Sequence, residues 1–188
     1  MSWMTGWYRA EADGATTTTQ KKNGYPIRVV GTRHKKNMFQ CAVSPMQPTK
    51  TNKSRTDNIA EFLFHIFDNN IKRVVKLGPI VDKGIRTCAS YFPRDDFPMN
   101  EPIRYVLNGR TMIVSKTSTM GPCGVDIQEV GLTMEVDKVA KKVKHYHHTT
   151  WSIREAPPKM GLYYFVELLY NAKETVLVHS VKLDQVAL

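Results

Sequence analysis

Three histidines stand close together in the sequence, at His145, His147 and His148. Imidazole nitrogens are common zinc ligands, so this cluster could indicate a metal centre. In a β-strand, however, His145 and His147 would lie on one face while His148 would point to the other. No cysteine accompanies the three histidines. The spacing therefore favours a structural role for them, and we expect the protein to carry neither a metal nor a cofactor.

Two other motifs contain residue types that can do chemistry. The adjacent carboxylates Asp95 and Asp96 could act as a catalytic pair, but Pro93 and Pro98 flank them and indicate an exposed loop. Residues 121–124 (Gly-Pro-Cys-Gly) form a stretch too short to cradle a phosphate, and a proline interrupts it. We expect a solvated turn in the first case and a connection between strands in the second.

The cysteines carry information about the cellular compartment. Cys41, Cys88 and Cys123 are odd in number and widely spaced, which argues against a disulfide framework. A reducing compartment is therefore expected, and we predict a cytoplasmic location. Cys41 and Cys88 lie in strand-like stretches and are expected to be small buried hydrophobic residues. No apolar run approaches the ~20 residues that a membrane-spanning helix needs, so we expect no membrane insertion.

Basic residues are concentrated in the first third of this chain of 188 residues, whose net charge is +10. Residues 1–60 hold 10 basic and 3 acidic side chains, a net charge of +7. Most of this excess lies between Lys21 and Arg55, where exposed cations would attract phosphorylated or acidic proteins. Aromatic residues do not alternate with these lysines, so the pattern gives no support for base stacking. Nucleic acid is therefore not an expected partner.

Apolar spacing in the first half of the chain predicts two strands and a helix. Residues 27–30 and 38–43 are short β-favouring runs, which predicts two strands joined by a turn. Apolar residues at helical spacing predict a helix over residues 59–67. Ser54 or Thr56 is expected to cap the amino end of this helix.

The second half contains most of the predicted sheet. We predict strands over residues 73–77, 103–107, 111–115, 125–136, 139–146 and 175–179. Asn108-Gly109 suits the two-residue turn of a hairpin. Residues 160–170 are apolar nearly all round, which predicts a buried helix, with a strand as the alternative. The chain has 28 valines and isoleucines against 10 leucines, so an α/β (α+β) fold is expected.

Several of these segments resemble, in order, parts of the catalytic domain of protein tyrosine phosphatases. Residues 61–67 (Glu-Phe-Leu-Phe-His-Ile-Phe) resemble the family's Asp-Phe-Trp-x-x-Ile/Val helix. Residues 87–93 (Thr-Cys-Ala-Ser-Tyr-Phe-Pro) are similar to its Lys-Cys-x-x-Tyr-Trp-Pro segment. Residues 145–151 resemble the strand that leads into its mobile Trp-Pro-Asp loop. The resemblance implies a central mixed sheet flanked by helices over residues 25–188, after a loose polar leader at residues 1–24.

The resemblance also shows which parts of the family's chemistry are replaced. That chemistry uses a nucleophilic cysteine, the arginine of a Cys-x5-Arg loop and an aspartic acid of the Trp-Pro-Asp loop. In this sequence Ser180 stands at the position of the cysteine and Val186 at that of the arginine. Trp151 is retained, whereas Ser152 replaces the loop proline and Ile153 replaces the acid. The sequence around Ser180 also has no glycine-containing phosphate loop that would let it act as a substitute nucleophile.

These replacements imply a catalytically inactive domain, a pseudophosphatase. We expect it to act by binding phosphorylated or acidic partners through the region from Lys21 to Arg55. The alternative is that a fuller product of the same locus carries the Cys-x5-Arg loop and dephosphorylates phosphotyrosine proteins. The helices that follow this loop in the family are missing here, so the chain resembles a truncated member. We therefore expect the strand over 175–179 to have an uncovered apolar face, which could support self-association.

Overall fold

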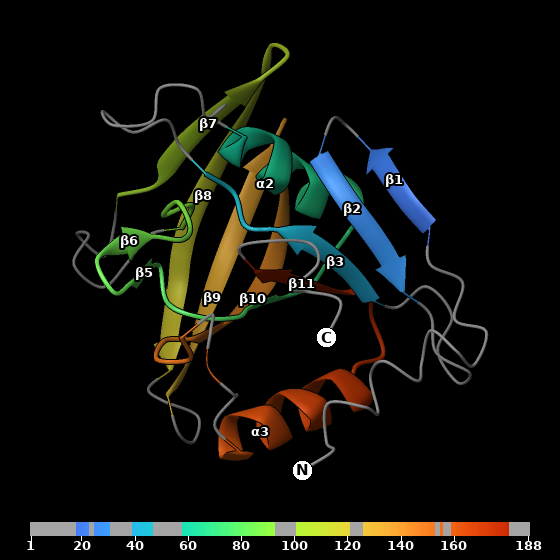
Figure 1. Ribbon diagram of the computed structural model, residues 1–188. Coiled ribbons are helices and arrows are strands. Elements are labelled where there is room, and N and C mark those ends of the chain that lie inside the picture. Colours follow the sequence, from blue (N-terminus) through green and yellow to red (C-terminus); the bar gives the residue numbers. More distant parts are fainter. Residues whose placement is uncertain are drawn as a thin grey trace.

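The computed structural model describes residues 18–22, 25–30, 39–46, 58–92, 101–120, 126–152, 155 and 159–180. Within these residues a nine-stranded mixed sheet has helix α2 (Ile59–Asp68) on one face and helix α3 (Lys159–Tyr170) on the other (Figure 1). Strands β5 (Val81–Asp82) and β6 (Ile85–Arg86) form a separate hairpin. The predicted α+β architecture with a central mixed sheet is confirmed.

The central strands of the large sheet are parallel. In sheet order the strands are β1 (Thr18–Lys22), β2 (Tyr25–Val30), β3 (Phe39–Val43), β11 (Val176–Ser180), β4 (Arg73–Lys76), β10 (Val139–His148), β9 (Ile127–Val136), β8 (Arg110–Met120) and β7 (Ile103–Leu107). Strands β3, β11, β4 and β10 run parallel to one another, and the pairings on both sides of them are antiparallel. The carboxyl ends of four neighbouring strands therefore meet at one edge of the sheet.

Strand β11 is the most completely buried of the inner strands. All five of its residues are buried. Leu177 belongs to the hydrophobic cluster on the α2 face, while Val176 and Val178 belong to the cluster on the α3 face. The prediction of an uncovered apolar face is wrong, because even Val178 is only 9% exposed. Phe165 of α3 belongs to the same buried cluster as Val176 and Val178 and supplies the cover that the sequence did not reveal.

Strand β1 lies within residues 1–24, which the sequence predicts to be a leader. It pairs with β2, from Thr18 opposite Val29 to Lys22 opposite Tyr25. An edge strand of threonine and lysine has no apolar period, so the sequence pattern did not reveal it. The residues before Thr18 lie outside the described part of the chain, and the limits of the domain stay a prediction.

Helix α2 forms where the apolar residues recur at helical spacing, as predicted. Seven of its ten residues are buried, including the aromatic side chains of Phe62, Phe64 and Phe67. Its N-cap is Asn58, so the prediction of Ser54 or Thr56 as the cap is wrong. The Asn58 side chain accepts a hydrogen bond from the backbone N–H of Met46 at 2.8 Å instead of bonding to the helix. A contact with a distant segment thus determines where this helix begins.

Two cations hold the carboxyl end of α2 against the sheet. Arg110 of β8 makes a bidentate ion pair with Asp68, with distances of 3.0 and 3.1 Å, and lies over the ring of Phe64. Lys141 of β10 donates a hydrogen bond of 2.7 Å to the carbonyl of Phe67. Positive charge is favourable at this end, where the helix dipole is negative.

The predicted hairpin at Asn108-Gly109 is confirmed, and a second hairpin joins the two strands predicted over residues 125–136 and 139–146. Asn108 and Gly109 join β7 to β8 with φ angles of 50° and 77°. Asp137 and Lys138 join β9 to β10 with φ angles of 50° and 64°, without a glycine. Two consecutive residues with positive φ match the right-handed twist of the paired strands.

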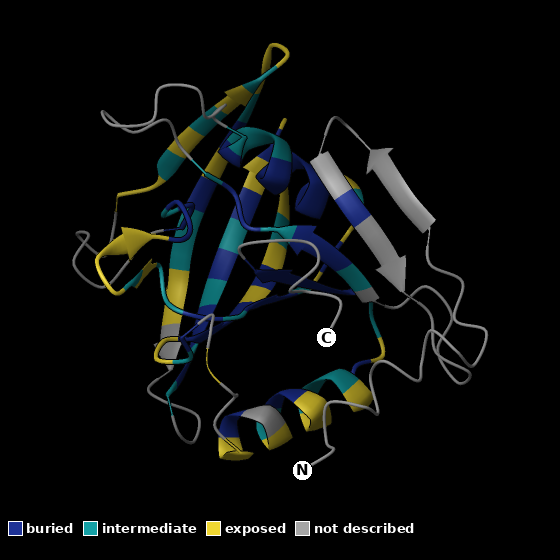
Figure 2. Cartoon of the chain, in the orientation of Figure 1, coloured by how far each residue is buried: buried dark blue, intermediate teal, exposed yellow. Residues whose placement is uncertain are grey.

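Helix α3 is half exposed, so the prediction of a buried helix is wrong. Gly161 and Phe165 are buried against the sheet, whereas Met160, Tyr163 and Tyr170 are 65%, 62% and 74% exposed (Figure 2). Within the described residues, no other element packs on this exposed side. Apolar composition alone did not distinguish a helix with neighbours on every side from one with a single neighbour.

Candidate functional site

The carboxyl ends of the parallel strands form the natural position for a site in this fold. Ligands of open sheets with parallel strands bind beyond the carboxyl ends of the strands. Here β11 ends at Ser180 and β3 is followed by Ser44, whose backbone N–H donates a hydrogen bond to the carbonyl of Ser180. Leu77, which follows β4, donates in the same way to the carbonyl of His179 at 3.0 Å. Strand β10 continues through His148 into the segment that carries Trp151.

A chain of buried polar side chains lies behind this edge. The hydroxyl of Tyr91 lies 2.5 Å from Nε2 of His145 and 2.7 Å from Nε2 of His179. Nδ1 of His179 lies 3.0 Å from Oγ of Ser44. The tyrosine hydroxyl has one proton, so it donates to one imidazole and accepts from the other. Both ring nitrogens of His179 therefore lie within hydrogen-bonding distance of a hydroxyl near the carboxyl end of the sheet.

Both histidines of this network are uncharged at neutral pH. Burial lowers the pKa of His145 well below its ordinary value, and the nearby His147 and Lys76 lower it further. Burial followed by the charge of Lys76 does the same to the pKa of His179. Because both nitrogens of His179 are occupied by Ser44 and Tyr91, this histidine is not placed to act as a base for Ser180.

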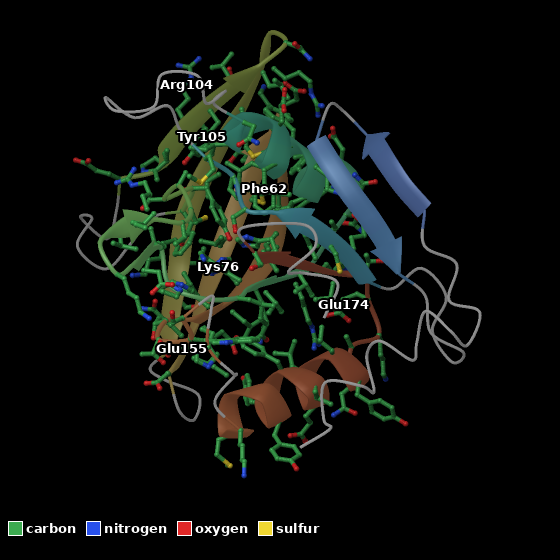
Figure 3. The ribbon with its side chains drawn as sticks, viewed as in Figure 1. Phe62, Lys76, Arg104, Tyr105, Glu155 and Glu174 are labelled. Atoms are coloured by element: carbon green, nitrogen blue, oxygen red, sulfur yellow. The ribbon has the colours of Figure 1, made fainter. Side chains whose placement is uncertain are left out.

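Lys76 is a buried amine at the end of β4, near the middle of the molecule (Figure 3). Its Nζ donates hydrogen bonds to the carbonyls of Gly78 at 2.7 Å and Pro79 at 3.3 Å. Burial lowers the pKa of Lys76. Burial raises the pKa of the neighbouring Cys88 to about 11, so Cys88 is a protonated thiol at neutral pH. The predictions that Cys41 and Cys88 are buried are confirmed.

The segment that carries the retained tryptophan is anchored at several points. The backbone N–H of Trp151 donates to Nδ1 of His148 at 3.2 Å, and its indole N–H donates to the carbonyl of Glu155 at 2.9 Å. The hydroxyl of Ser152 lies 3.0 Å from the carboxylate of Asp82, and Lys83 pairs with Glu155 at 3.0 Å. Two links therefore connect this segment to the β5–β6 hairpin.

The first of these links, from Ser152 to Asp82, depends on a position where the family that the sequence resembles has a proline. Proline has no hydroxyl, so the bond from Ser152 to Asp82 is possible only because serine stands at this position. On the other side, Oγ1 of Thr150 donates to the carboxylate of Asp126 at 2.9 Å. The segment is thus fixed from both sides by polar contacts.

The three clustered histidines occupy two faces of β10, as their spacing predicts. The rings of His145 and His147 both lie close to Phe92, and Nε2 of His147 donates to the carbonyl of Gly78 at 3.0 Å. His148 instead packs against Phe165 of α3. Across the described part of the chain, no three His, Cys, Asp or Glu side chains are arranged to hold a metal ion.

The candidate residues of the sequence analysis are distributed unevenly. Ser180 and Trp151 lie at the carboxyl edge of the sheet, and Ser180 is 6% exposed. The other candidates lie outside the described residues: Ile153, Val186, Asp95, Asp96 and residues 121–124, which include Cys123. The same is true of the basic region from Lys21 to Arg55, except for residues 21–22, 25–30 and 39–46.

Sequence reasoning missed three residues that organise this edge. Ser44, Lys76 and Asp82 were not singled out, although each contacts a candidate residue or its neighbours. Lys76 did give a signal, because it follows Val74 and Val75 in an apolar run. A charged residue within a buried strand must find polar partners, which marks it as part of a network. Ser44 and Asp82 gave no such signal.

Comparisons with known proteins agree with this geometry. The model of the family "Protein-tyrosine phosphatase" matches residues 21–182. No curated protein matches the chain. In the part of the chain that the structure describes, none of the helices is long and apolar enough to cross a membrane.

Solved structures show the same fold at low sequence identity. The catalytic domain of human protein tyrosine phosphatase non-receptor type 18 is 14% identical, with a TM-score of 0.65, and the match covers 82% of this chain and 51% of that one. The same phosphatase in complex with HER2 phosphopeptides gives 14% identity, a TM-score of 0.67 and coverages of 85% and 50%. A Trypanosoma cruzi protein tyrosine phosphatase gives 16% identity, a TM-score of 0.60 and coverages of 75% and 46%.

The present chain therefore spans about half the length of these solved structures. The family model covers residues 21–182, which is most of the chain, and the solved structures share its fold. The chain belongs to the protein-tyrosine phosphatase family.

Proposed function

We propose that this chain is a catalytically inactive tyrosine-phosphatase-like domain that acts by binding phosphorylated or acidic proteins. The observation that carries the proposal is Ser180 at the carboxyl end of the central strand β11, where the family has its nucleophilic cysteine. A serine hydroxyl needs a neighbouring base, and His179 is already bonded to Ser44 and Tyr91.

The other parts of the mechanism point the same way. Val186 cannot form the bidentate contact by which an arginine holds a phosphate, and Ile153 cannot donate a proton to a leaving group. The described thiols offer no substitute, because Cys41 and Cys88 are buried and Cys88 has a raised pKa. Losing the nucleophile, the phosphate contact and the acid together removes both the covalent route and the stabilisation of charge.

The bond between Ser152 and Asp82 adds a further argument. Closure of a loop over its substrate is a common step in catalysis. In this chain the tryptophan-bearing segment is instead linked to the β5–β6 hairpin by Ser152 and by the Lys83–Glu155 pair. Such links favour one fixed position of the segment, which suits a binding domain better than an enzyme that opens and closes.

The proposed partners follow from charge and from the family. Between Lys21 and Arg55 the chain carries most of its excess of basic residues, which would attract phosphate groups and carboxylates. A relative of the same family, human non-receptor type 18, has been solved in complex with HER2 phosphopeptides. We further propose that the domain occupies residues 25–188 and acts in the cytoplasm.

Hydrolysis of an aryl phosphate by the purified chain tests the inactive assignment. We expect no turnover above the buffer rate, and no rescue by Ser180→Cys, because the phosphate contact is still missing. The matched control is Ser90→Cys, which adds a thiol at a partly exposed position away from β11. Turnover that follows the protein through purification and disappears in Ser180→Ala would contradict the proposal.

Binding of a fluorescent phosphotyrosine peptide tests the proposed partner. Affinity should fall steeply as salt rises, since exposed charges are screened. Reversal of Lys35, Lys36, Lys50 and Lys53 to glutamate should abolish binding. Reversal of four exposed lysines outside this region, Lys138, Lys142, Lys159 and Lys173, changes the net charge equally and serves as the matched control. Binding that survives the first set of reversals would show that this region is not the contact surface.

A second assignment is supported by the coverage of the solved relatives. Because the chain spans about half of their length, a fuller product of the same locus could carry the Cys-x5-Arg loop and dephosphorylate phosphotyrosine proteins. Sequencing the transcript across the codons for residues 178–188 decides between the two. An in-frame Cys-x5-Arg downstream would favour the enzyme.

A further inference from the structure

His148 is buried at the carboxyl end of β10 with only one of its two ring nitrogens bonded. Nδ1 accepts a hydrogen bond from the backbone N–H of Trp151 at 3.2 Å, so the proton of the neutral ring lies on Nε2. Among the described residues, Nε2 has no hydrogen-bond partner, and water does not reach it. A buried N–H without an acceptor costs free energy, so a native protein that keeps one needs a reason for it.

Helix α3 lies directly against the unpartnered nitrogen. A Cβ on Gly161 would be 2.5 Å from Nε2 of His148, so glycine is what lets the first turn of α3 come this close to the ring. One turn later, the ring of Phe165 has its centroid 5.8 Å from that of the imidazole, and the Trp151 ring lies at 5.9 Å. His148 therefore contacts two elements at once, the segment that carries Trp151 and the beginning of α3.

A second proton on the ring would disrupt both contacts. The proton would bind to Nδ1, the nitrogen that accepts from Trp151, and two N–H donors would then face each other. The other donor, on Nε2, would stay against the backbone of Gly161. A charged ring in this position would be buried with neither of its donors bonded, which is strongly unfavourable. Protonation should therefore move the ring out of its place.

Asp126, which precedes β9, offers the protonated ring an alternative partner. Its carboxylate accepts a hydrogen bond from the hydroxyl of Thr150 at 2.9 Å, beside the segment that His148 anchors. The charge of Asp126 raises the pKa of His148, but the larger effect of burial lowers it. The buried position thus favours the neutral ring, and the neighbourhood of Asp126 favours the charged one.

The other titratable groups on the neighbouring elements do not compete for this role. Glu155 of the same segment pairs with Lys83, and Lys159 in the first turn of α3 is exposed. Thiols and phenols do not ionise between about pH 5 and 7 at their ordinary pKa values. Those that belong to the same cluster as Phe165 are Cys41, Tyr146 and Tyr164.

We propose that His148 is a pH-sensitive latch between the Trp151 segment and helix α3. The neutral ring holds the backbone of Trp151 and the first turn of α3 in place. The protonated ring turns towards Asp126 and releases both. Histidine changes its charge between about pH 5 and 8, so the latch responds to modest acidification.

NMR spectroscopy of the full chain labelled with 15N-tryptophan tests the latch. Trp3→Phe and Trp7→Phe leave Trp151 as the one tryptophan, with one backbone and one indole N–H signal. From about pH 7.5 to 5, the protection of the backbone N–H against solvent exchange should fall at least ~10-fold as His148 is protonated. The indole N–H bonds to the carbonyl of Glu155 and is the internal reference, whose protection should change less than ~2-fold. Histidine ring shifts from the same samples report the protonation of His148.

Two variants separate the latch from general effects of acid. His148→Asn places an amide oxygen near the position of Nδ1 but does not titrate in this range, so the Trp151 backbone should stay protected at every pH. His147→Gln is the matched control, because His147 lies on the opposite face of β10, where it bonds to the carbonyl of Gly78. It should leave the pH profile of Trp151 unchanged.

Gly161→Ala tests the contact with α3 and leaves His148 in place. The added Cβ would meet the ring, so we expect weaker protection of the Trp151 backbone at neutral pH and a midpoint shifted upward, towards the ordinary pKa of histidine. Alanine favours a helix more than glycine does, so this result could not come from a weaker α3.

Four results would overturn the proposal. His148 could be protonated while the Trp151 backbone keeps its protection, or the ring could stay neutral down to about pH 5. His148→Asn could lose protection in acid as the original chain does. Gly161→Ala could leave both the protection and the midpoint unchanged.

Discussion

The two faces of the central sheet share the same strands but are packed very differently. On one face, seven residues of α2 are buried together with Val74 and Leu177. On the other face, α3 contributes Phe165 and Gly161 to the interior and leaves Met160, Tyr163 and Tyr170 exposed. The helix on the first face is buried over most of its length, whereas the helix on the second face is exposed on its outer side.

The residues that link the chain to its family follow the same division. Tyr91, His145 and His179 lie on the α2 face, where the ring of Tyr91 contacts Phe62 at a centroid distance of 5.1 Å. Ser152, a departure from the family's loop, belongs to the segment that leads to α3 and contacts His148 through Trp151. The comparison teaches that the fold of this family depends on the densely buried α2 face, which holds the Tyr91–His145–His179 network.

Truncation of one core phenylalanine on each face gives the largest contrast. We expect Phe62→Ala to lower the free energy of unfolding by about 3–5 kcal/mol, since it leaves a cavity among well-packed neighbours. Phe165→Ala should cost roughly 1 kcal/mol less, because α3, exposed on its outer side, can move into the space. Urea denaturation measures both values. An equal or larger loss for Phe165→Ala would show that the α3 face is packed as firmly as the other.

Removal of the buried tyrosine hydroxyl probes the polar network on the α2 face. Tyr91→Phe leaves two imidazole nitrogens without their partner, and we expect a loss of about 1–3 kcal/mol in the free energy of unfolding. Tyr163→Phe, on the exposed side of α3, is the control. In dilute protein it should change stability by less than ~0.5 kcal/mol. A Tyr91→Phe effect as small as this control would mean that water replaces the hydroxyl without cost.

Local patterns predicted most of the elements on both faces. The period of Ile59, Phe62, Leu63 and Ile66 gave α2, and Asn108-Gly109 gave the β7–β8 turn, because these signals lie within a few residues of one another. The resemblance to the family's buried segments predicted the central sheet and the place of Ser180 at the end of one of its strands. Interactions between neighbours in sequence were therefore sufficient for the framework.

Local sequence patterns could not predict the contacts between segments that are far apart in the chain. The side chain of Asn58 accepts a hydrogen bond from the backbone N–H of Met46. Only the folded chain shows that α2 has its N-cap at this residue. The burial of Lys76 depends on carbonyls that follow the strand, and the exposure of α3 depends on which elements pack against it. For the same reason, the bond between Ser152 and Asp82, 70 positions apart, could not be expected from either residue.

On the α3 face, His148 should make the free energy of unfolding depend on pH. This ring is buried against Phe165 and beneath Gly161, where an added Cβ would lie 2.5 Å from its Nε2. Burial lowers the pKa of His148, although the nearby Asp126 partly opposes this effect. Nδ1 of His148 accepts the N–H of Trp151, so protonation would also break that bond.

Because the pKa of His148 is lower in the folded state, the unfolded chain takes up its proton first as the pH falls below ~6.5. The free energy of unfolding should then decrease until the pH passes the folded pKa. Comparison with His148→Gln isolates this contribution from those of His145 and His179. We expect the original chain to lose more stability than the variant between pH 7 and 5. Parallel curves for the two proteins would show that His148 is protonated without penalty.

The smallest expected effect concerns the ion pair that ties α2 to β8. Arg110 and Asp68 form two hydrogen bonds at the surface, and Arg110 also lies 4.7 Å from the centre of the Phe64 ring. Their side chains are 43% and 28% exposed, so solvent screens the pair and its coupling should be about 0.5–1 kcal/mol. A double-mutant cycle of Arg110→Ala and Asp68→Asn separates this coupling from the ring contact, which Asp68→Asn leaves in place. The coupling should shrink at high salt, whereas the ring contribution should remain. A coupling that exceeds ~2 kcal/mol, or that does not change with salt concentration, would contradict this prediction. It would show that the ion pair behaves as a buried one and is not screened by solvent.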